Sequence, residues 1–390
     1  MFIKKEISNV FSRKNIKWKL TRLVIELTQR CNNNCIHCLI NLPADDFTSK
    51  QNELRTEEIK EIIQEAASLG CISIRFTGGE PLLRDDFKNI YLFTKKLGAR
   101  VSIFTNATLI NESMCNLWRR FSPLAPIEVS IYGMKRHSYE SVTRNPGSFY
   151  AAQNGIKLLV ENKIPFLIKS AVLPQNKSDL KDLNTWVSSI PATSKYPSYA
   201  MFFDLRCRRD SLEKNILIKK NRISPKEGLK ILDGNTMSYT RGLRTSCQKK
   251  KFYIHGSKLF SCNAGLKGGF IDAYGKMYIC ALLRDPSTAY CLNSGSLDDA
   301  LRNHFFQIRQ FQAKNEKYLS RCANCFIKII CTQCPGKSWA ETGVLDEPVE
   351  YLCKIAHLKA TYLGLLKNKE KSWQINDWEK RVAIFKESQQ

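Results

Sequence analysis

The sequence predicts an α/β fold, in which a partial (β/α)6 TIM-like barrel is followed by a small cysteine-rich domain. Short apolar runs alternate with longer amphipathic runs as far as about residue 206, which is the pattern of βα units around a parallel sheet. Beyond residue 210 this alternation lapses. Between residues 256 and 295, glycines, cysteines and short strand-like runs indicate a loop-rich module that bound metal would hold together.

Six strands and five helices are expected in the barrel. The apolar runs that predict strands are residues 23–27, 72–76, 101–104, 127–131, 166–172 and 200–205. The amphipathic runs between them, several opened by a capping residue or by acidic residues, are residues 56–69, 84–97, 111–121, 149–162 and 178–189. Six such units make an incomplete barrel.

The chain divides by composition into five parts. These are a basic N-terminal extension at 1–20, the barrel at 21–210, a bridging region at 211–255, the cysteine-rich domain at 256–355 and a charged helical tail at 356–390. Trp373, Trp378 and Phe385 are the expected apolar anchors of the tail. The first strand starts so early that a separate peptide-recognition domain is not expected before it.

Composition narrows the class of protein. The 390 residues are 43% hydrophobic, which is enough for a core, and neither a membrane span nor a signal peptide is recognisable, so we expect a cytoplasmic protein. In such a compartment the 15 cysteines favour metal ligation over disulfides. The net charge of +25 fits either a polyanionic partner or a solvated lysine surface, and composition alone leaves both open.

Three cysteines follow the first predicted strand, in the stretch Cys31-Asn-Asn-Asn-Cys35-Ile-His-Cys38. The asparagine run favours a loop, and loops after the strands of a βα barrel carry its functional groups. Three closely spaced thiolates can hold three corners of a [4Fe-4S] cluster and leave the fourth iron open. A partial zinc site or plain packing residues are the alternatives.

A glycine-rich turn, Gly78-Gly79-Glu80-Pro81, follows the second predicted strand. Two glycines allow a backbone edge to approach a ligand closely, and Glu80 can accept a hydrogen bond from an amine. Alone, the turn is weak evidence for a ligand site. Its position one βα unit after a Cys-x3-Cys-x2-Cys loop makes that evidence strong.

With both motifs, residues 22–206 resemble the radical S-adenosylmethionine (radical SAM) superfamily. The resemblance implies that Cys31, Cys35 and Cys38 bind a [4Fe-4S] cluster and that the amino and carboxyl groups of S-adenosylmethionine chelate the open iron. It also implies that residues 78–81 contact the amino group, and that one electron cleaves the sulfonium to give a 5'-deoxyadenosyl radical.

Three further positions fit the resemblance. Thr105-Asn106-Ala107 stands where the family usually has Thr-Asn-Gly. Ser130 corresponds to a serine that contacts the cofactor's ribose, the alternative being a serine that merely ends a strand. A ring at the position of His37 commonly lies near the adenine, so we expect His37 to pack there rather than to ligate iron.

The second cysteine group reads Cys322-x2-Cys325-x5-Cys331-x2-Cys334, with Cys262 and Cys280 before it and Cys353 after it. Zinc knuckles are the alternative, but ribbon-type zinc sites place about 15–20 residues between their pairs. The layout resembles the SPASM extension of peptide-modifying radical SAM enzymes, which carries auxiliary clusters, although the family has three residues rather than two between the last two cysteines of the tight group.

That resemblance implies two auxiliary [4Fe-4S] clusters. The distal cluster would be held by Cys322, Cys325, Cys331 and Cys353, and the proximal one by Cys262, Cys280 and Cys334. The proximal cluster is then one ligand short, and either Cys247 or a substrate thiolate could fill the place. The scattered cysteines, which are Cys71, Cys115, Cys207 and Cys291, are expected to be buried small hydrophobes.

The resemblance implies a maturase that oxidatively modifies a ribosomally made peptide or protein, giving a cross-link or a thioether. A formylglycine-forming sulfatase maturase is less favoured, because Ala281 stands where those enzymes carry an aspartate after the cysteine. The net positive charge would fit a tRNA-modifying radical enzyme. No RNA-binding module is recognisable, however, so nucleic acid is not the expected partner. An iron-sulfur electron carrier would have no use for residues 78–81.

The expected partners are a peptide, with an acidic leader as a natural complement to the basic surface, and an electron donor such as flavodoxin or ferredoxin. Leader binding could also need a separate peptide-recognition protein. The proton donor or acceptor stays open among Asp204, Asp210, Tyr132 and Cys247.

Overall fold

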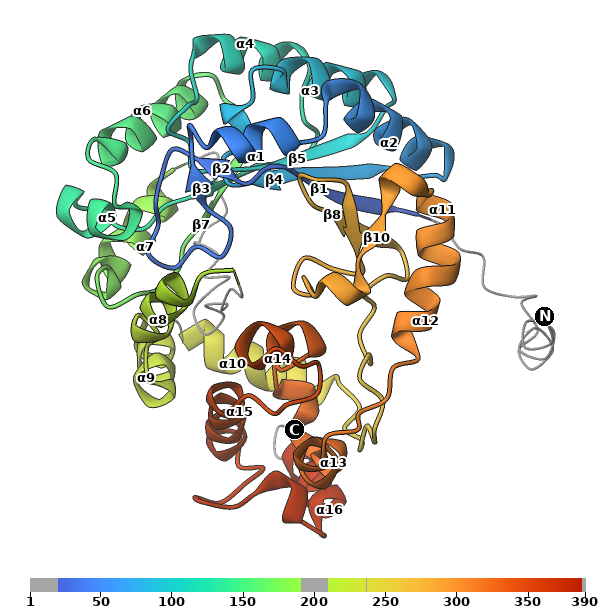
Figure 1. Cartoon of the computed structure of the whole chain (residues 1–390). Coiled ribbons are helices and arrows are strands. Elements are labelled where there is room, and N and C mark those ends of the chain that lie inside the picture. Colours follow the sequence, from blue (N-terminus) through green and yellow to red (C-terminus); the bar gives the residue numbers. More distant parts are fainter. Residues whose placement is uncertain (1–19, 191–209, 236, 388–390) are drawn as a thin grey trace, which may run out of the picture.

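The computed structural model describes residues 20–190, 210–235 and 237–387 (Figure 1). Its centre is an eight-stranded sheet in the order β10-β9-β8-β1-β4-β5-β6-β7. The barrel strands are β1 (Arg22–Thr28), β4 (Ser73–Gly78), β5 (Arg100–Thr105), β6 (Ile127–Ser130) and β7 (Phe166–Lys169). All five run parallel, which confirms the α/β prediction, and the sixth expected strand, 200–205, lies outside the described residues.

Helices cover the outer face of this sheet (Figure 1). They are α2 (Thr56–Ser68), α3 (Phe87–Lys96), α4 (Glu112–Arg120), α5 (Arg136–Thr143), α6 (Ser148–Glu161) and α7 (Leu180–Ser189), and only α5 has no predicted counterpart. In α2, Ile59, Ile63 and Ala66 recur at helical spacing and are buried against the strands. Asn111 caps α4, because its side chain accepts a hydrogen bond from the amide of Met114 at 3.0 Å.

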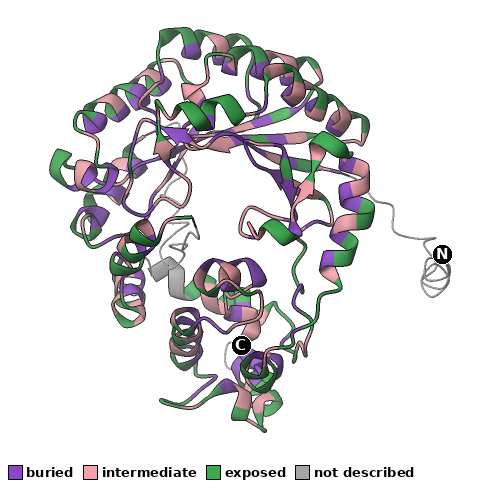
Figure 2. Cartoon of the chain, viewed as in Figure 1, coloured by how far each residue is buried: buried purple, intermediate pink, exposed green. Residues whose placement is uncertain are grey.

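Alternation along the strands separates an outer from an inner face. Ile74 and Phe76 of β4 belong to the core under the helices, and the Phe76 ring lies 6.2 Å from Phe87 of α3. Arg75, between them, points to the opposite, concave face, because successive side chains of a strand alternate. The outer core is therefore apolar, and the strands of the sheet are largely buried (Figure 2).

Strands from the cysteine-rich segment extend the barrel sheet. β8 (Gly268–Ile271) pairs parallel with β1, and β9 (Lys276–Tyr278) and β10 (Tyr290–Cys291) follow antiparallel. Gly268 allows this pairing, because a Cβ there would lie 2.0 Å from the Arg22 carbonyl oxygen. The short strands were expected from sequence, but their union with β1 was not, since nothing local in a four-residue strand indicates its partner.

The remaining elements lie around the cysteine loop, beside β10 at the edge of the sheet, and below the open side of the sheet (Figure 1). They are β2 (Arg30–Cys31), β3 (Leu42–Pro43), α1 (Phe47–Asn52), α8 (Leu212–Lys220), α9 (Pro225–Asn235), α10 (Met237–Gln248), α11 (Leu297–Asp299), α12 (Phe305–Arg309), α13 (Glu316–Ser320), α14 (Pro335–Thr342), α15 (Glu350–Tyr362) and α16 (Trp378–Glu387). Among the described residues, no helix is long and apolar enough to cross a membrane.

The C-terminal tail is helical as expected, but it is broken in the middle. Gly364 ends α15 with a φ of +78°, a conformation that glycine adopts without strain. The chain returns through the short turn η9 (Ser372–Gln374) before α16. Phe385 is buried, and the Trp378 ring stacks on Phe326 at 5.8 Å, so these two predicted anchors attach the tail to the cysteine-rich region.

Candidate active site

The Cys31–Cys38 loop leaves the sheet at the carboxyl end of β1, as predicted. The amide of Asn33 donates to Cys31 Sγ at 3.4 Å, and the amide of Cys38 donates to the Cys35 carbonyl at 3.1 Å. Burial, reinforced by the neighbouring thiols Cys38 and Cys31, raises the pKa of Cys35 well above its usual value. The three thiols therefore interact electrostatically, and binding iron would release their protons.

The Gly78-Gly79 turn holds this loop by backbone contact. The amide of Gly79 donates to the Thr28 carbonyl at 2.8 Å, and that of Glu80 donates to the Arg30 carbonyl at 2.9 Å. A Cβ on Gly78 would lie 2.2 Å from Thr28 O, and one on Gly79 would lie 2.2 Å from Arg30 O. Both glycines are thus required by the approach of the chain to itself, in addition to the ligand approach predicted from sequence.

Glu80 is fully buried and joins the second loop to the third. Its Oε1 accepts from the Thr105 hydroxyl at 2.8 Å and from the Leu82 amide at 3.1 Å, while Oε2 accepts from the Asn106 amide at 2.7 Å. Burial, opposed by these hydrogen bonds, raises the pKa of Glu80 to about 7. Two carboxylate oxygens offer about four acceptor positions, so one position remains for a further donor. Pro81 follows, buried at the start of the turn Pro81–Leu83.

Asn106 reaches across to the cysteine loop. Its Nδ2 donates to Asn32 Oδ1 at 2.9 Å and lies 3.7 Å from Cys31 Sγ. The next residue, Ala107, has a φ of +64°, which explains why a glycine is usual at this position. The chain keeps the conformation with alanine, because the Thr105 hydroxyl accepts from the Ala107 amide at 3.0 Å.

Ser130, Tyr132 and His37 form a buried group beside the loop. Ser130 ends β6, and burial, opposed by Ser130, raises the pKa of Tyr132. The His37 ring meets Tyr132 edge-on at 4.8 Å, and burial lowers the pKa of His37 to about 4. His37 Nδ1 is buried without a hydrogen-bond partner in the described structure, so the group has unused polar capacity at the place expected for a cofactor.

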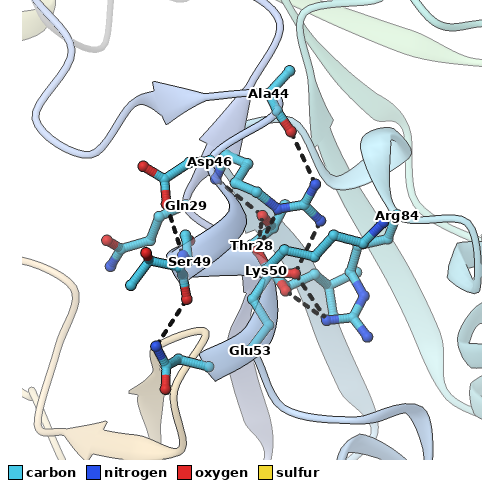
Figure 3. A network of polar contacts seen from close by, with 12 residues as sticks. Thr28, Gln29, Ala44, Asp46, Ser49, Lys50, Glu53 and Arg84 are labelled. Carbon is cyan, nitrogen blue, oxygen red and sulfur yellow. Dashed lines mark hydrogen bonds and ion pairs between the residues drawn. The ribbon is translucent and has the colours of Figure 1, made fainter.

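An ion-pair network behind the loop was not predicted (Figure 3). Arg30, directly before Cys31, donates from Nε to Glu53 Oε1 at 2.9 Å and from Nη2 to Oε2 at 3.0 Å. Glu53 also accepts from the Thr28 hydroxyl and lies 3.6 Å from Arg84. Both side chains of the main pair are at most 7% exposed. The available sequence signal was a charged residue between a buried strand and the first cysteine.

The predicted distal set comes together in the C-terminal part. The thiols of Cys322, Cys325 and Cys331 lie on consecutive short turns, and α15 carries Cys353 to them. Burial, reinforced by Cys331 and Cys353, raises the pKa of Cys322 to about 12. Burial, opposed by a hydrogen bond from Ser372 and reinforced by Cys331 and Cys322, raises the pKa of Cys325 to about 12.

The predicted proximal set also comes together. Burial, with contributions from Cys334 and Cys262, raises the pKa of Cys280, which follows β9. Cys247 lies elsewhere, 1% exposed in the apolar cluster that contains Phe252. Cys280, Cys334 and Cys262 thus interact electrostatically, and the choice between Cys247 and a substrate thiolate as the fourth ligand stays open.

The other candidate residues are placed as follows. Cys71 and Cys115 are buried as expected, whereas Cys291 is exposed because it lies on β10 at the end of the sheet order, so that prediction was wrong. Cys207 and Asp204 lie outside the described residues, and Asp210 is exposed just before α8. Within the described ranges, no group of three or more His, Cys, Asp or Glu side chains is arranged closely enough to hold a single metal ion.

A family comparison agrees with the geometry of the cysteine loop and the glycine turn. The family model described as "Radical SAM superfamily" matches residues 25–187, which include every barrel strand in the described part and both motifs. Residues 25–187 therefore form a radical SAM domain. This domain uses a [4Fe-4S] cluster and S-adenosylmethionine, and a cysteine-rich region follows the matched residues.

Relatives of this radical SAM enzyme act in different chemistries. It is 26% identical to the AdoMet-dependent heme synthase of Methanosarcina barkeri, over 84% of this chain and 94% of that protein. It is 33% identical to the Fe-coproporphyrin III synthase of the same organism, over 40% of this chain and 38% of that protein. It is 27% identical to a GTP 3',8-cyclase of Clostridium botulinum, over 48% of this chain and 57% of that protein.

Solved structures share the fold over most of the chain. SuiB of Streptococcus suis bound to S-adenosylmethionine is similar with a TM-score of 0.57 and 18% identity, covering 78% of this chain and 70% of SuiB. The protein anSMEcpe with bound AdoMet and a Cp18Cys peptide is similar with a TM-score of 0.54 and 15% identity, covering 94% of this chain and 99% of that one.

The residues of the site fit the cofactors of the radical SAM enzyme. Thiols in groups of three and four, N–H groups aimed at sulfur and an unpartnered imidazole nitrogen are suitable surroundings for iron-sulfur clusters and a polar ligand. When bound, the cluster and S-adenosylmethionine supply the one-electron radical chemistry. The protein's part is positional: Gly79 and Arg30 fix the loop, Glu80 ties it to β5, and the His37 ring packs edge-on against Tyr132.

Proposed function

We propose that this radical SAM enzyme is a maturase that oxidatively modifies a ribosomally made peptide or protein, forming a cross-link or thioether. Two thiol sets beyond the barrel support the proposal, because an auxiliary cluster can take up the electron that a substrate radical releases on oxidation. The set of Cys322, Cys325, Cys331 and Cys353 would offer four thiols to one cluster, and the set of Cys262, Cys280 and Cys334 would offer three to a second. A substrate thiolate is the ligand that we assign to the remaining position of the second cluster.

The inner face of the sheet carries charges that suit an anionic substrate. Glu128 of β6 is paired with Arg75 of β4 and lies 3.4 Å from Lys169 of β7. Glu128 is 8% exposed, whereas Arg75 keeps 45% of its side chain exposed. Two cations on one carboxylate leave a net positive charge, and unused guanidinium and ammonium donors can receive a substrate carboxylate.

The net positive charge of the whole chain would also favour binding of a peptide whose leader is acidic. If the +25 charge attracts an acidic leader, binding should weaken as salt rises from about 50 to 300 mM, because added salt screens exposed charges. Fluorescence anisotropy of a labelled acidic peptide measures this. An affinity that does not change across that range would contradict an electrostatic leader contact.

Heme synthesis is the second candidate, favoured by the similarity to the Methanosarcina barkeri heme synthase over most of both chains. A porphyrin carboxylate would meet the same cations as an acidic peptide. The sulfatase-maturing and tRNA-modifying alternatives have no comparable observation in the described structure.

Product analysis separates the two candidates. The reconstituted protein is incubated with S-adenosylmethionine, a reductant and either a short cysteine-containing peptide encoded beside its gene or Fe-coproporphyrin III. We expect the peptide to lose two hydrogens by mass spectrometry and the porphyrin to be unchanged. Formation of heme, with no change in the peptide, would contradict the maturase proposal.

A further inference from the structure

The C-terminal tail lies directly on the distal thiol set. After α15 ends, the turn η9 (Ser372–Gln374) packs against the short turns that carry Cys322 and Cys325. Ser372 is 1% exposed and Cys325 is 9% exposed, so this contact is dry. The four predicted ligands of the distal cluster are all cysteines. The residues of η9 are not among them, so the role of this turn is open.

Ser372 aims a hydroxyl at the Cys325 sulfur. Its Oγ lies 3.0 Å from Cys325 Sγ and 3.2 Å from His357 Nε2. The Nε2 atom already accepts from the Ser372 amide at 3.2 Å, and the His357 proton is assigned to Nδ1, which lies 2.9 Å from the Cys353 carbonyl oxygen. A thiolate bound to iron has no proton to donate, so the hydroxyl is the donor to sulfur.

A second donor reaches the other end of the set. Arg321 Nη2 lies 3.6 Å from Cys353 Sγ, and Arg321 Nη1 donates to Glu350 at 2.6 Å. The Trp373 ring, next to Ser372, lies 4.7 Å from the guanidinium carbon and holds it in place by a cation–π contact. The same three-residue turn thus supplies one donor and positions another.

We propose that the turn Ser372–Gln374 is a hydrogen-bond clamp that raises the reduction potential of the distal cluster, through Ser372 on Cys325 and Arg321 on Cys353. The inference rests on the proposed function for its assignment of that cluster. Reduction adds one electron, and donors to the cysteine sulfurs stabilise the added negative charge. A raised potential favours uptake of the electron that the substrate radical releases when it is oxidised. Ser372 and Arg321 are positioning residues, since they act through the cysteines.

The test is a redox titration of the auxiliary clusters by electron paramagnetic resonance. All proteins carry Cys31→Ala, Cys35→Ala and Cys38→Ala, so that the signals belong to the auxiliary clusters alone. We expect Ser372→Ala to shift the midpoint of one auxiliary signal to lower potential and leave the other in place. At a fixed potential near the midpoint, the ratio of reduced to oxidised distal cluster should fall by about threefold or more.

Two variants provide the controls. Ser372→Thr keeps a hydroxyl and should restore the parent midpoint, which a merely structural role would not require. Ser68→Ala removes an exposed serine that bonds only the Glu65 carbonyl, and it should change nothing. An unshifted midpoint in Ser372→Ala at full iron content, or an equal shift in Ser372→Thr, would overturn the clamp and leave the maturase proposal intact. Undiminished iron after Cys325→Ala and Cys353→Ala would overturn the distal cluster as well.

Discussion

Single residues at the site are constrained by the chain's own backbone. Gly79 is required because the Arg30 carbonyl occupies the space of a Cβ, and Ala107 shows that a positive φ can be held by a residue other than glycine. The sequence motif identified the position of both residues. It could not show that the carbonyl of Arg30 was the near neighbour, because that contact depends on the register of β1 with β4.

Replacing Gly79 with alanine should disrupt the loop. The new methyl group would lie 2.2 Å from Arg30 O and 2.7 Å from Gln29 O, so the backbone must move and the two amide contacts that hold the loop are lost. We expect a loss of about 3 kcal/mol in the free energy of unfolding and loss of S-adenosylmethionine binding. Urea unfolding and isothermal titration calorimetry measure these effects.

Gly98→Ala is the matched control. Gly98 has a φ of +76° with nothing within 4 Å of a Cβ, so the substitution introduces backbone strain alone. It should cost about 1 kcal/mol and leave cofactor binding unchanged. If Gly79→Ala resembled Gly98→Ala in both measurements, the steric account of the turn would be incorrect.

The positions of helices and strands could be predicted from the sequence pattern more closely than the contacts between these elements. The five barrel strands and the helices α2, α3, α4, α6 and α7 lie where apolar periodicity predicts them. The pairing of β8 with β1 and the return of the tail at η9 were not predictable, because both depend on contacts between residues that are far apart in sequence. The Arg30–Glu53 ion pair was not predictable for the same reason, because it joins β2 to the end of α1.

The Arg30–Glu53 pair should stabilise the cysteine loop substantially. Glu53→Gln would leave buried Arg30 without its carboxylate and also deprive Arg84 of its neighbour at 3.6 Å. Removing one partner of a buried pair costs about 3–5 kcal/mol. We expect that loss in urea unfolding, together with less iron retained after reconstitution.

Glu57→Gln is the control for this substitution. Glu57 pairs with Lys60 at 2.9 Å and is 74% exposed, so the same chemical change should alter stability by less than about 1 kcal/mol. Equal effects of the two variants would show that the buried network has no special role.

At the scale of the whole molecule, the sequence predicted three sets of cysteines, and thiols within each set raise one another's pKa in the structure. Ligation by these sets stays a proposal. Cys247 shows the limit of spacing arguments, because it is near Cys262 in sequence but is buried in an apolar cluster with Cys325, whereas Cys262 is exposed. Substrate identity was beyond the sequence, since the inner-face cations Arg75 and Lys169 come from strands that only the fold brings together.

The central claim is that the cluster of the barrel forms the radical, whereas the auxiliary clusters are needed for the modified product. It is tested most directly by measuring 5'-deoxyadenosine formed from S-adenosylmethionine under reducing conditions. The account predicts that replacing Cys31, Cys35 and Cys38 with alanine abolishes 5'-deoxyadenosine, whereas Cys322→Ala or Cys353→Ala retains cleavage and loses only the modified product. Continued cleavage by the triple variant would contradict the account.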